Sequence, residues 1–487
     1  MKPILLLSFL LIAITINAQW AQQGLDIDGQ FNNEKIGNAV DMPDPFTLAV
    51  GAKSSSLVNG FQAGKVSVHR WNGNSWSLKG TPLFGSAPAN NFGTSVSMPD
   101  SNTLAVSAPS YMNKGQVKIF NWNGSSWVQK GIDLLGDSVS GPFGALVCMP
   151  DSNTIAVGIS DRNSFGSSKT GQVKVFRWDG NSWLQRGNLI SGDSTGDQLG
   201  WSVSMPDSNT LAVSAPFADG ANKNDCGEVK IFSWSGISWV QKGASIFGEA
   251  SSDFSGESIS MPDSNTLAIG AAVNDGNGPA SGHARVFRWN GTNWLQKGLD
   301  IDGEASGDYS GKALSMPDSN TIAIGAFFNQ GNGIDAGHVR VFSWNNSSWT
   351  QKGMDLDAES AGDRFGESVH MPEANIVCAG ATENDGSFTN AGHVRVFRDT
   401  SFSTGLAVFQ EAETALIIYP NPTKNNFIFK VDRLLLNQRM QILSMQGQVI
   451  FESRKKTTEQ VISVNDWDAG IYFVRYGDSI KKLVITK

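Results

Sequence analysis

The stretch FGTSVSMPDSNTLAVSA, residues 92–108, decides the fold because close copies of it recur along most of the 487-residue chain. Its Met-Pro dipeptide returns at spacings of 56, 51, 56, 56, 55 and 55 residues, starting at Met42, Met98, Met149, Met205, Met261, Met316 and Met371. Self-similarity at a fixed period is the signature of a repeat architecture. The sequence therefore predicts seven repeats of about 55 residues each.

Each repeat predicts four short strands. In the second repeat, residues 92–98 alternate small and larger side chains, and a Pro-Asp-Ser-Asn turn separates them from the apolar run 103–108. Residues 115–122 alternate again, and an Asn-Gly turn leads into the last strand. Four short strands joined by tight turns are typical of a propeller blade. We predict an all-β fold with a seven-bladed β-propeller over residues 19–400.

The two ends of the repeat array predict how the ring closes. The seventh repeat stops near Phe397 and lacks the Trp hairpin and the fourth strand of the others. Residues 20–29, WAQQGLDIDG, match residues 294–303, WLQKGLDIDG, in the fifth repeat. We therefore expect the N-terminal strand to complete the last blade, which removes exposed strand edges.

Charge and composition restrict the class of partner. The net charge of −8 argues against a nucleic-acid partner and against an anionic membrane surface. Met1-Lys2, the apolar run 3–16 and Ala18 predict a signal peptide over residues 1–18, and no later segment predicts a transmembrane span. The odd count of three cysteines, Cys148, Cys226 and Cys378, argues against a disulfide framework and against a zinc site.

Phe92-Gly93, Phe365-Gly366, the run 106–109 and the Gly-x-Val-x-x-Phe strands resemble the FG-GAP repeats of integrin-α-type propellers, over residues of about 19 to 400. Many repeats of that family carry an Asp-x-Asx-x-Asx-Gly calcium loop between the first two strands. Here that position holds Met-Pro-Asp-Ser-Asn, which is too short and lacks the oxygen ligands. The calcium site of the family is therefore not expected, and no cofactor is predicted.

The C-terminal segment, residues 417–487, carries a second resemblance. Its motif residues are Tyr419, Pro420, Asn421, Pro422, Gly470, Tyr472, Lys481 and Lys482. They resemble the type IX (Por) secretion C-terminal sorting domain, which implies a small Ig-like β-sandwich, passage through the type IX secretion machinery, and a secreted or outer cell-surface location. Residues 401–416 are then a linker.

The histidines and tryptophans are first compared between repeats, because a catalytic residue should be peculiar to one repeat. His283, His338 and His393 follow a Gly at the start of the third strand, in a slot that holds Lys, Gln or Glu elsewhere, so we expect a structural or surface role and no metal. The paired tryptophans flank the hairpin between the third and fourth strands, and we expect blade packing rather than sugar-stacking platforms. These pairs are Trp71/Trp76, Trp122/Trp127, Trp178/Trp183, Trp234/Trp239, Trp289/Trp294 and Trp344/Trp349.

Acidic loops offer oxygen ligands that could bind Ca²⁺ weakly, although solvated turns explain them as well. Their residues are Asp300, Asp302, Glu304, Asp308, Asp355, Asp357, Glu359, Asp363, Asn274, Asp275, Asn384 and Asp385.

No catalytic, cofactor-binding or nucleotide-binding motif stands out, so the chain is expected not to be an enzyme. The first hypothesis is a secreted or surface protein that binds an extracellular glycan or protein, in adhesion for example. Two alternatives stay open: a polysaccharide hydrolase or lyase using acids in the propeller funnel, and a spacer without a small ligand. Trp201, Asp225-Cys226 and the loop 162–165 depart from the repeat and mark where a site should be sought.

Overall fold

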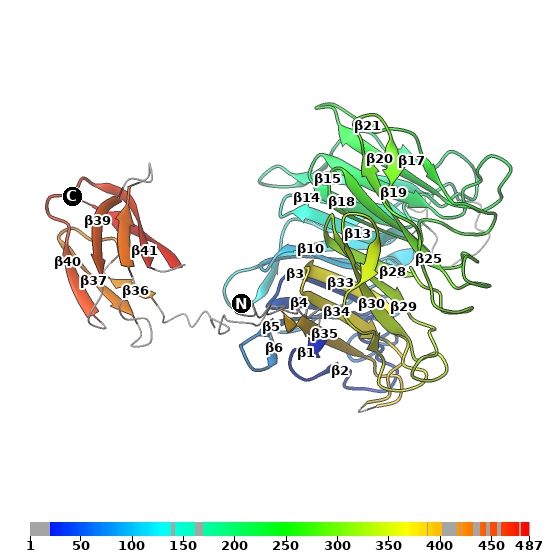
Figure 1. Cartoon of the computed structure of the whole chain (residues 1–487), viewed down its shortest axis with the longest axis horizontal. Coiled ribbons are helices and arrows are strands. Elements are labelled where there is room, and N and C mark those ends of the chain that lie inside the picture. Colours follow the sequence, from blue (N-terminus) through cyan, green and yellow to red (C-terminus); the bar gives the residue numbers. More distant parts are fainter. Residues whose placement is uncertain are drawn as a thin grey trace, which may run out of the picture. The chain divides into compact units, whose positions relative to one another are not determined.

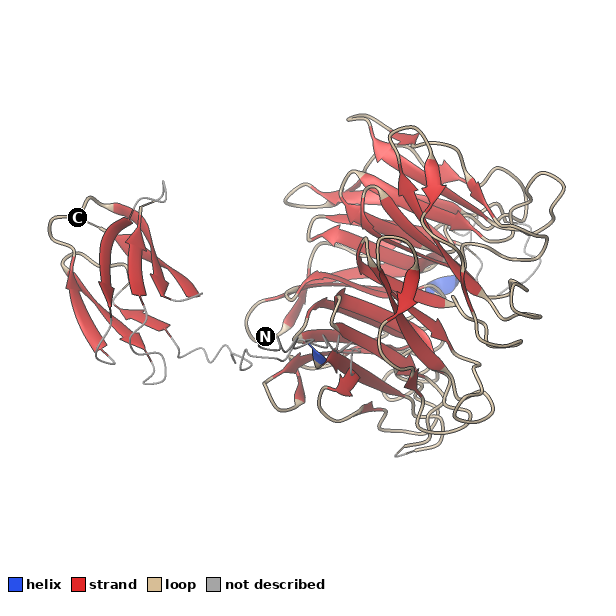
Figure 2. Ribbon diagram, viewed as in Figure 1, coloured by secondary structure: helices blue, strands red, loops and turns tan. Residues whose placement is uncertain are grey.

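The computed structural model describes residues 20–137, 142–160, 169–386, 388–401, 416–419, 421–431, 439–444, 449–454, 459–476 and 479–486. The chain divides into two compact units, Met1–Phe402 and Ser403–Lys487. The described residues are almost entirely strands and loops, with a short 3-10 segment at Tyr111–Asn113 (Figure 2). No helix within these ranges has the length and apolar character needed to cross a membrane. The predicted signal peptide and most of the linker lie outside the described residues.

The described strands of the first unit form seven five-stranded antiparallel sheets (Figure 1), which we call blades 1 to 7 in chain order. The innermost strands of blades 1 to 7 are β3 (Ala39–Asp44), β8 (Val96–Asp100), β13 (Phe143–Asp151), β18 (Val203–Asp207), β23 (Ser258–Asp263), β28 (Ala313–Asp318) and β33 (Phe365–Glu373). Each contacts the innermost strand of the next blade, and β33 returns to β3, so the series is closed. This arrangement is that of a β-propeller.

The second strands are apolar and buried along their whole length, which is typical of strands covered on both faces. They are β4 (Thr47–Ala52), β9 (Thr103–Ala108), β14 (Thr154–Ile159), β19 (Thr210–Ala215), β24 (Thr266–Ala271), β29 (Thr321–Ala326) and β34 (Ile376–Ala381). The third strands are β5 (Lys65–Trp71), β10 (Gln116–Trp122), β15 (Gln172–Trp178), β20 (Glu228–Trp234), β25 (His283–Trp289), β30 (His338–Trp344) and β35 (His393–Asp399).

Each third strand pairs with a three-residue fourth strand and, farther along, with a two-residue fifth strand that the sequence analysis did not predict. The fourth strands of blades 1 to 6 are β6 (Trp76–Leu78), β11 (Trp127–Gln129), β16 (Trp183–Gln185), β21 (Trp239–Gln241), β26 (Trp294–Gln296) and β31 (Trp349–Gln351). The fifth are β7 (Leu83–Phe84), β12 (Leu134–Leu135), β17 (Ile190–Ser191), β22 (Ile246–Phe247), β27 (Ile301–Asp302) and β32 (Leu356–Asp357).

The N-terminal strands supply the missing strands of blade 7, as the repeat comparison predicts. Strand β1 (Trp20–Gln22) pairs with β35 in the register Trp20↔Asp399. Strand β2 (Ile27–Asp28) pairs with the start of the same strand, Asp28 opposite His393. The first and last strands of the unit therefore lie in one sheet.

A ring of indole hydrogen bonds joins neighbouring blades at their outer strands. The second Trp of each hairpin donates its Nε1–H to a main-chain carbonyl of the preceding blade. Trp20 closes the ring by donating to the Lys352 carbonyl at 2.8 Å. The first Trp of each pair packs against a glycine of the preceding blade, such as Gly80 against Trp122. The tryptophans are therefore packed between blades, which favours the packing interpretation over sugar platforms.

The second unit consists of two antiparallel sheets around one core. The first sheet contains β36 (Leu416–Tyr419), β37 (Asn426–Val431) and β40 (Glu459–Ser463), and the second contains β39 (Val449–Arg454), β38 (Arg439–Leu443), β41 (Gly470–Tyr476) and β42 (Ser479–Ile485). Phe427 and Phe429 of the first sheet are fully buried in the same cluster as Ile442 and Leu483 of the second. Two sheets that share an apolar core form a β-sandwich.

Candidate functional site

The innermost strands of all seven blades line a central channel with a volume of about 550 Å³. The residue before each Met-Pro dipeptide occupies the same place on each of these strands. In most blades this residue is serine, whereas blades 1, 3 and 7 hold Asp41, Cys148 and His370. The channel is therefore the place where the repeats carry different chemical groups.

The side chains at this position connect the blades around the axis. Each one accepts a hydrogen bond from the main-chain N–H of the Met in the next blade, as Ser97 Oγ does from Met149 at 2.9 Å. The complete series of acceptors is Asp41, Ser97, Cys148, Ser204, Ser260, Ser315 and His370. Since His370 accepts from Met42, the hydrogen bonds run once around the ring and close.

Asp41 and His370 make a polar contact where the ring closes, with His370 Nε2 3.1 Å from Asp41 Oδ1. Because Nδ1 accepts from the Met42 N–H at 3.2 Å, the network assigns the imidazole proton to Nε2. Both ring nitrogens are thus engaged in structural contacts. Burial raises the pKa of Asp41, and it raises the pKa of the Cys148 thiol to about 12, which keeps the sulfur uncharged.

A four-residue segment lies just before or at the start of the innermost strand of six blades, and we call these six segments the mouth turns. They are residues 35–38, 91–94, 198–201, 254–257, 309–312 and 364–367. In each, the first residue has a positive φ, between 49° and 58°, and the third residue is a glycine with positive φ. Non-glycine residues adopt this conformation rarely, and it concentrates at functional sites.

The outer two positions of the mouth turns hold a different pair of residues in each of the six blades, whereas the second strands repeat closely, as TLAVGA in β4, TLAVSA in β9 and β19, and TLAIGA in β24. The pairs at the first and fourth positions are Lys35/Asn38, Asn91/Thr94, Gln198/Trp201, Phe254/Glu257, Tyr309/Lys312 and Arg364/Glu367. The fourth-position residues Asn38, Thr94, Glu257, Lys312 and Glu367 belong to the channel wall. The mouth turns therefore surround one end of the channel with side chains of differing chemistry.

Charged contacts connect several mouth turns. Lys312 Nζ lies 2.6 Å from Glu257 Oε1. Glu383, two residues after the second strand of blade 7, contacts both Lys35 Nζ at 2.6 Å and Arg364 Nη1 at 3.3 Å. The side chains of Lys312 and Arg364 remain 31% and 39% exposed, so these cations are accessible from solvent.

Aromatic side chains lie beside the same turns. The Phe217 ring packs between Trp201 and Phe254, with centroid distances of 5.4 and 5.1 Å. Tyr309 packs against Phe328 at 5.2 Å, and the Arg364 guanidinium stacks over Phe328 at 5.2 Å. The blade-specific Trp201, singled out from the sequence, is thus part of an aromatic group next to the channel.

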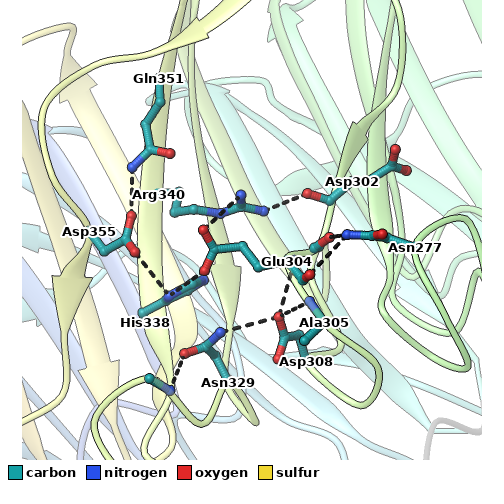
Figure 3. Close-up of polar contacts among 12 residues, drawn as sticks. Asn277, Asp302, Glu304, Ala305, Asp308, Asn329, His338, Arg340, Gln351 and Asp355 are labelled. Carbon is teal, nitrogen blue, oxygen red and sulfur yellow. Dashed lines mark hydrogen bonds and ion pairs between the residues drawn. The ribbon is translucent and has the colours of Figure 1, made fainter.

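The three histidines that begin β25, β30 and β35 are buried. Of the two roles expected for this position, structural or surface, the surface role therefore does not apply to them. Each faces an aspartate of its own blade and a glutamate of the preceding blade, as Figure 3 shows for His338 with Asp355 and Glu304. Burial lowers the pKa of all three imidazoles to about 4. The slot therefore holds a neutral imidazole beside two carboxylates.

The acidic loops use many of their oxygens within their own turns. Asn274 Oδ1 accepts from the Gly276 N–H at 2.8 Å, and Asp308 Oδ2 accepts from the Ala305 N–H at 2.9 Å.

Of the other residues that depart from the repeat, Cys226 is buried, and burial raises the pKa of its thiol. The loop 162–165 lies outside the described residues.

The sorting-motif residues lie in the second unit. Asn421 Oδ1 accepts from the Val484 N–H at 2.8 Å, and the Tyr472 hydroxyl donates to the Asp468 carbonyl at 2.9 Å. Tyr419 ends β36 as an exposed residue. Gly470 pairs with Ile485, while Lys481 and Lys482 pair with Val474 and Phe473. Pro422 precedes Thr423 near the end of β42, and Pro420 lies outside the described residues.

Comparison with solved structures gives similar folds at low sequence identity. The chain is 9% identical to a putative 6-phosphogluconolactonase from Bacteroides uniformis (TM-score 0.48, covering 90% of this chain and 99% of that one). It is 11% identical to the GH74 enzyme of Niastella koreensis (TM-score 0.47, covering 95% of this chain and 74% of that one). It is 10% identical to the β-propeller domain of the Trilobed protease from Pyrococcus furiosus (TM-score 0.41, covering 75% of this chain and 89% of that one). Among curated proteins, none matches the chain.

These neighbours correct one prediction. The chain was expected not to be an enzyme because no catalytic motif stands out, but the similar structures are mostly enzymes, so that expectation is contradicted. The reasoning failed because a propeller brings single side chains from distant repeats together at its axis, as Asp41 and His370 show. Such sites leave no local motif in the sequence.

One family model matches the chain, over residues 417–487, and its description is a secretion system C-terminal sorting domain. The match confirms the resemblance drawn from the Tyr-Pro-Asn-Pro and Gly-x-Tyr motifs. A segment of this kind implies handling by the type IX secretion machinery, with export to the cell surface or beyond. Residues 417–487 are therefore a secretion system C-terminal sorting domain, attached to a repeated β-propeller in a secreted or surface protein.

Proposed function

We propose that this chain is an exported seven-bladed β-propeller, of the FG-GAP type, that binds an extracellular glycan at its mouth turns. The sorting domain, which we assign to the Ig-like sandwiches, delivers it to the place where such a ligand is met. The observation that carries the proposal is the variability of the mouth turns: their first and fourth side chains differ in each of the six blades and five of the fourth residues belong to the channel wall. Asymmetric side chains on a symmetric scaffold are what recognition of one ligand requires.

The chemistry of the mouth turns suits a carbohydrate. Aromatic rings such as Phe254 and Tyr309 offer apolar faces for the C–H surfaces of sugar rings. Glu257, Lys312 and Arg364 supply acceptors and donors for hydroxyl or carboxylate groups. A few placed polar groups beside apolar faces are the usual composition of a ligand site.

A glycan array probed with the full chain tests the proposal. The matched variant replaces Phe254 with Asn and Glu257 with Thr, which reproduces the natural pair Asn91/Thr94 on the same backbone turn. Because blade 2 already carries this pair, the fold should tolerate it. The wild-type chain should bind a defined set of glycans and the variant should lose them. An array on which the wild-type chain binds nothing would refute glycan binding.

A second candidate function is hydrolysis or elimination of a polysaccharide in the same channel. The observation that favours it is that Asp41, His370, Glu257 and Glu367 bring ionisable groups to the axis, so the channel is not lined by serines alone. Release of reducing ends or unsaturated sugars from the glycans that bind, and its loss in Glu257→Gln or Glu367→Gln, would support it. Binding without any product would exclude it.

A further inference from the structure

The junctions between blades 4 and 5, 5 and 6, and 6 and 7 repeat one constellation of side chains. Each contains the histidine that begins the third strand, an aspartate before the fifth strand of the same blade, and a glutamate after the fifth strand of the preceding blade. The three sets are His283/Asp300/Glu249, His338/Asp355/Glu304 and His393/Asp26/Glu359. Within each set, one ligand atom from every residue lies within 4.8 Å of the others.

Each histidine in these sets has at least one buried ring nitrogen without a hydrogen-bond partner among the described residues. His283 Nδ1 and both ring nitrogens of His393 are buried and unpaired among the described residues, and these side chains are at most 1% exposed. The nearest aspartate oxygens lie 3.6 Å away in both cases and 3.8 Å away for His338. These separations are too long for a hydrogen bond. They approach the spacing of about 3.4 Å between two ligands that share one tetrahedral ion.

The aspartates are held by neighbouring groups that turn one carboxylate oxygen toward the imidazole. The side-chain amides of Gln296, Gln351 and Gln22 donate to Oδ1 of the three aspartates, at 2.6, 2.5 and 2.5 Å, so that Oδ2 faces the imidazole. Glu304 divides its oxygens in the same way, with Oε1 3.6 Å from Arg340 and Oε2 3.9 Å from His338 (Figure 3). Such outer contacts orient metal ligands in known sites.

The local charge favours a bound cation. With a neutral imidazole, each set holds two carboxylates against one arginine, namely Arg285, Arg340 or Arg395. A further aspartate stands two residues after each ligand aspartate: Asp302, Asp357 and Asp28. This excess negative charge is what a divalent ion would neutralise.

Blades 1 and 2 show how the side chain at the histidine position can pair with a carboxylate without a bound ion. In blade 2, Gln116 replaces the histidine, and its amide donates directly to Asp133 Oδ2 at 2.5 Å. In blade 1, Lys65 occupies the slot and pairs with Glu34 at 2.6 Å. A donor or a cation therefore pairs with a carboxylate in the slot of these two blades, whereas in blades 5, 6 and 7 the imidazole Nδ1 stays 3.6–3.8 Å from the nearest aspartate oxygen.

We propose that the three histidine sets are equivalent sites for a divalent transition-metal ion of the Zn²⁺ type, each bound by one imidazole and two carboxylates from two adjacent blades. Imidazole nitrogen with carboxylate oxygen is a donor set that Zn²⁺ accepts, and water would complete the coordination. Because every site uses ligands from two blades, the ions would also crosslink three consecutive junctions.

The experiment measures Zn²⁺ bound to the full chain after chelator treatment and dialysis, by titration calorimetry and elemental analysis. We expect three equivalents of Zn²⁺. His283→Gln, His338→Gln and His393→Gln should each remove one equivalent, and the triple variant should bind none. Glutamine occupies this slot in blades 2 and 3, so these variants should fold. His370→Ser, which installs the serine found before Met-Pro in most blades, is the matched control and should retain all three equivalents.

Two further readouts separate ligation from a structural role of the histidines. Co²⁺ in place of Zn²⁺ should give visible d–d absorption that each His→Gln substitution lowers by about a third. Millimolar Ca²⁺, which prefers sites of oxygen ligands alone, should not displace Zn²⁺. Failure to bind Zn²⁺, a stoichiometry below three, or binding that survives in the triple variant would overturn the proposal. None of these results bears on glycan binding at the mouth turns, which the array tests separately.

Discussion

Replacement of His69 by phenylalanine should stabilise the propeller, and more strongly as the pH falls. His69 lies in β5, half-buried, at a position where the other six blades carry Phe120, Phe176, Phe232, Phe287, Phe342 and Phe397. Its Nε2 lies 3.0 Å from Ser67 Oγ. Burial, and secondarily the charge of Lys65, lower the pKa of His69 to about 4.

The size of the effect follows from the difference in proton binding between the folded and unfolded chains. The unfolded histidine has a pKa of about 6.5 and takes up a proton as the pH falls below that value. The folded histidine stays neutral until the pH approaches its own pKa of about 4. The wild-type chain therefore loses stability between these two values, by about 2 kcal/mol at pH 5, and the phenylalanine variant does not.

Urea unfolding followed by tryptophan fluorescence, at pH 7.5 and pH 5, measures the effect. The stability difference between His69→Phe and the wild-type chain should grow by about 2 kcal/mol on acidification. The reciprocal variant Phe120→His is the matched control, because it should acquire the same acid sensitivity. A stability difference that is equal at the two pH values would refute the assignment of a neutral buried imidazole.

Three other substitutions test the packing of the ring by urea unfolding. Trp20→Phe removes the indole donor to the Lys352 carbonyl and should cost about 1 kcal/mol; an unchanged midpoint would contradict closure by the N-terminal strand. Gly131→Ala should cost about 1–3 kcal/mol, because its Cβ would lie 2.7 Å from the Trp178 ring at a φ of +79°, and full stability would contradict this contact. Cys148→Ser should change stability by less than about 1 kcal/mol, because serine fills this slot in four blades; a larger loss would give the thiol a role beyond accepting from Met205.

The repeat architecture could be predicted from sequence because each strand type carries its own local pattern. The apolar run 103–108 predicts a strand covered on both faces, and β9 has those bounds. The match between residues 20–29 and 294–303 predicts the strand exchange seen in β1 and β2. The fifth strands escaped prediction, since two residues such as Ile301–Asp302 are too short to show a period.

The candidate site could be predicted only in part. Trp201 was singled out because it departs from its repeat, and it does lie beside the channel. Asp41 and His370 are 329 residues apart, and only ring closure brings them together. The histidines at the start of β25, β30 and β35 were expected to bind no metal because blade 1 carries a lysine at the same position. In the structure that lysine, Lys65, pairs with a carboxylate of its own, Glu34. A slot can thus hold different chemistry in different blades.

The central claim is that the mouth turns are the ligand site. It is tested most directly by titrating the best glycan from the array against three full-length chains: the wild type, the mouth variant Phe254→Asn with Glu257→Thr, and an outer-strand control. The control is Leu295→Thr, which alters an exposed residue of β26 to the one found at Thr350 of β31. We predict that the mouth variant loses at least tenfold in affinity while the control binds like the wild type. Equal affinity of the mouth variant and the wild type would contradict the account.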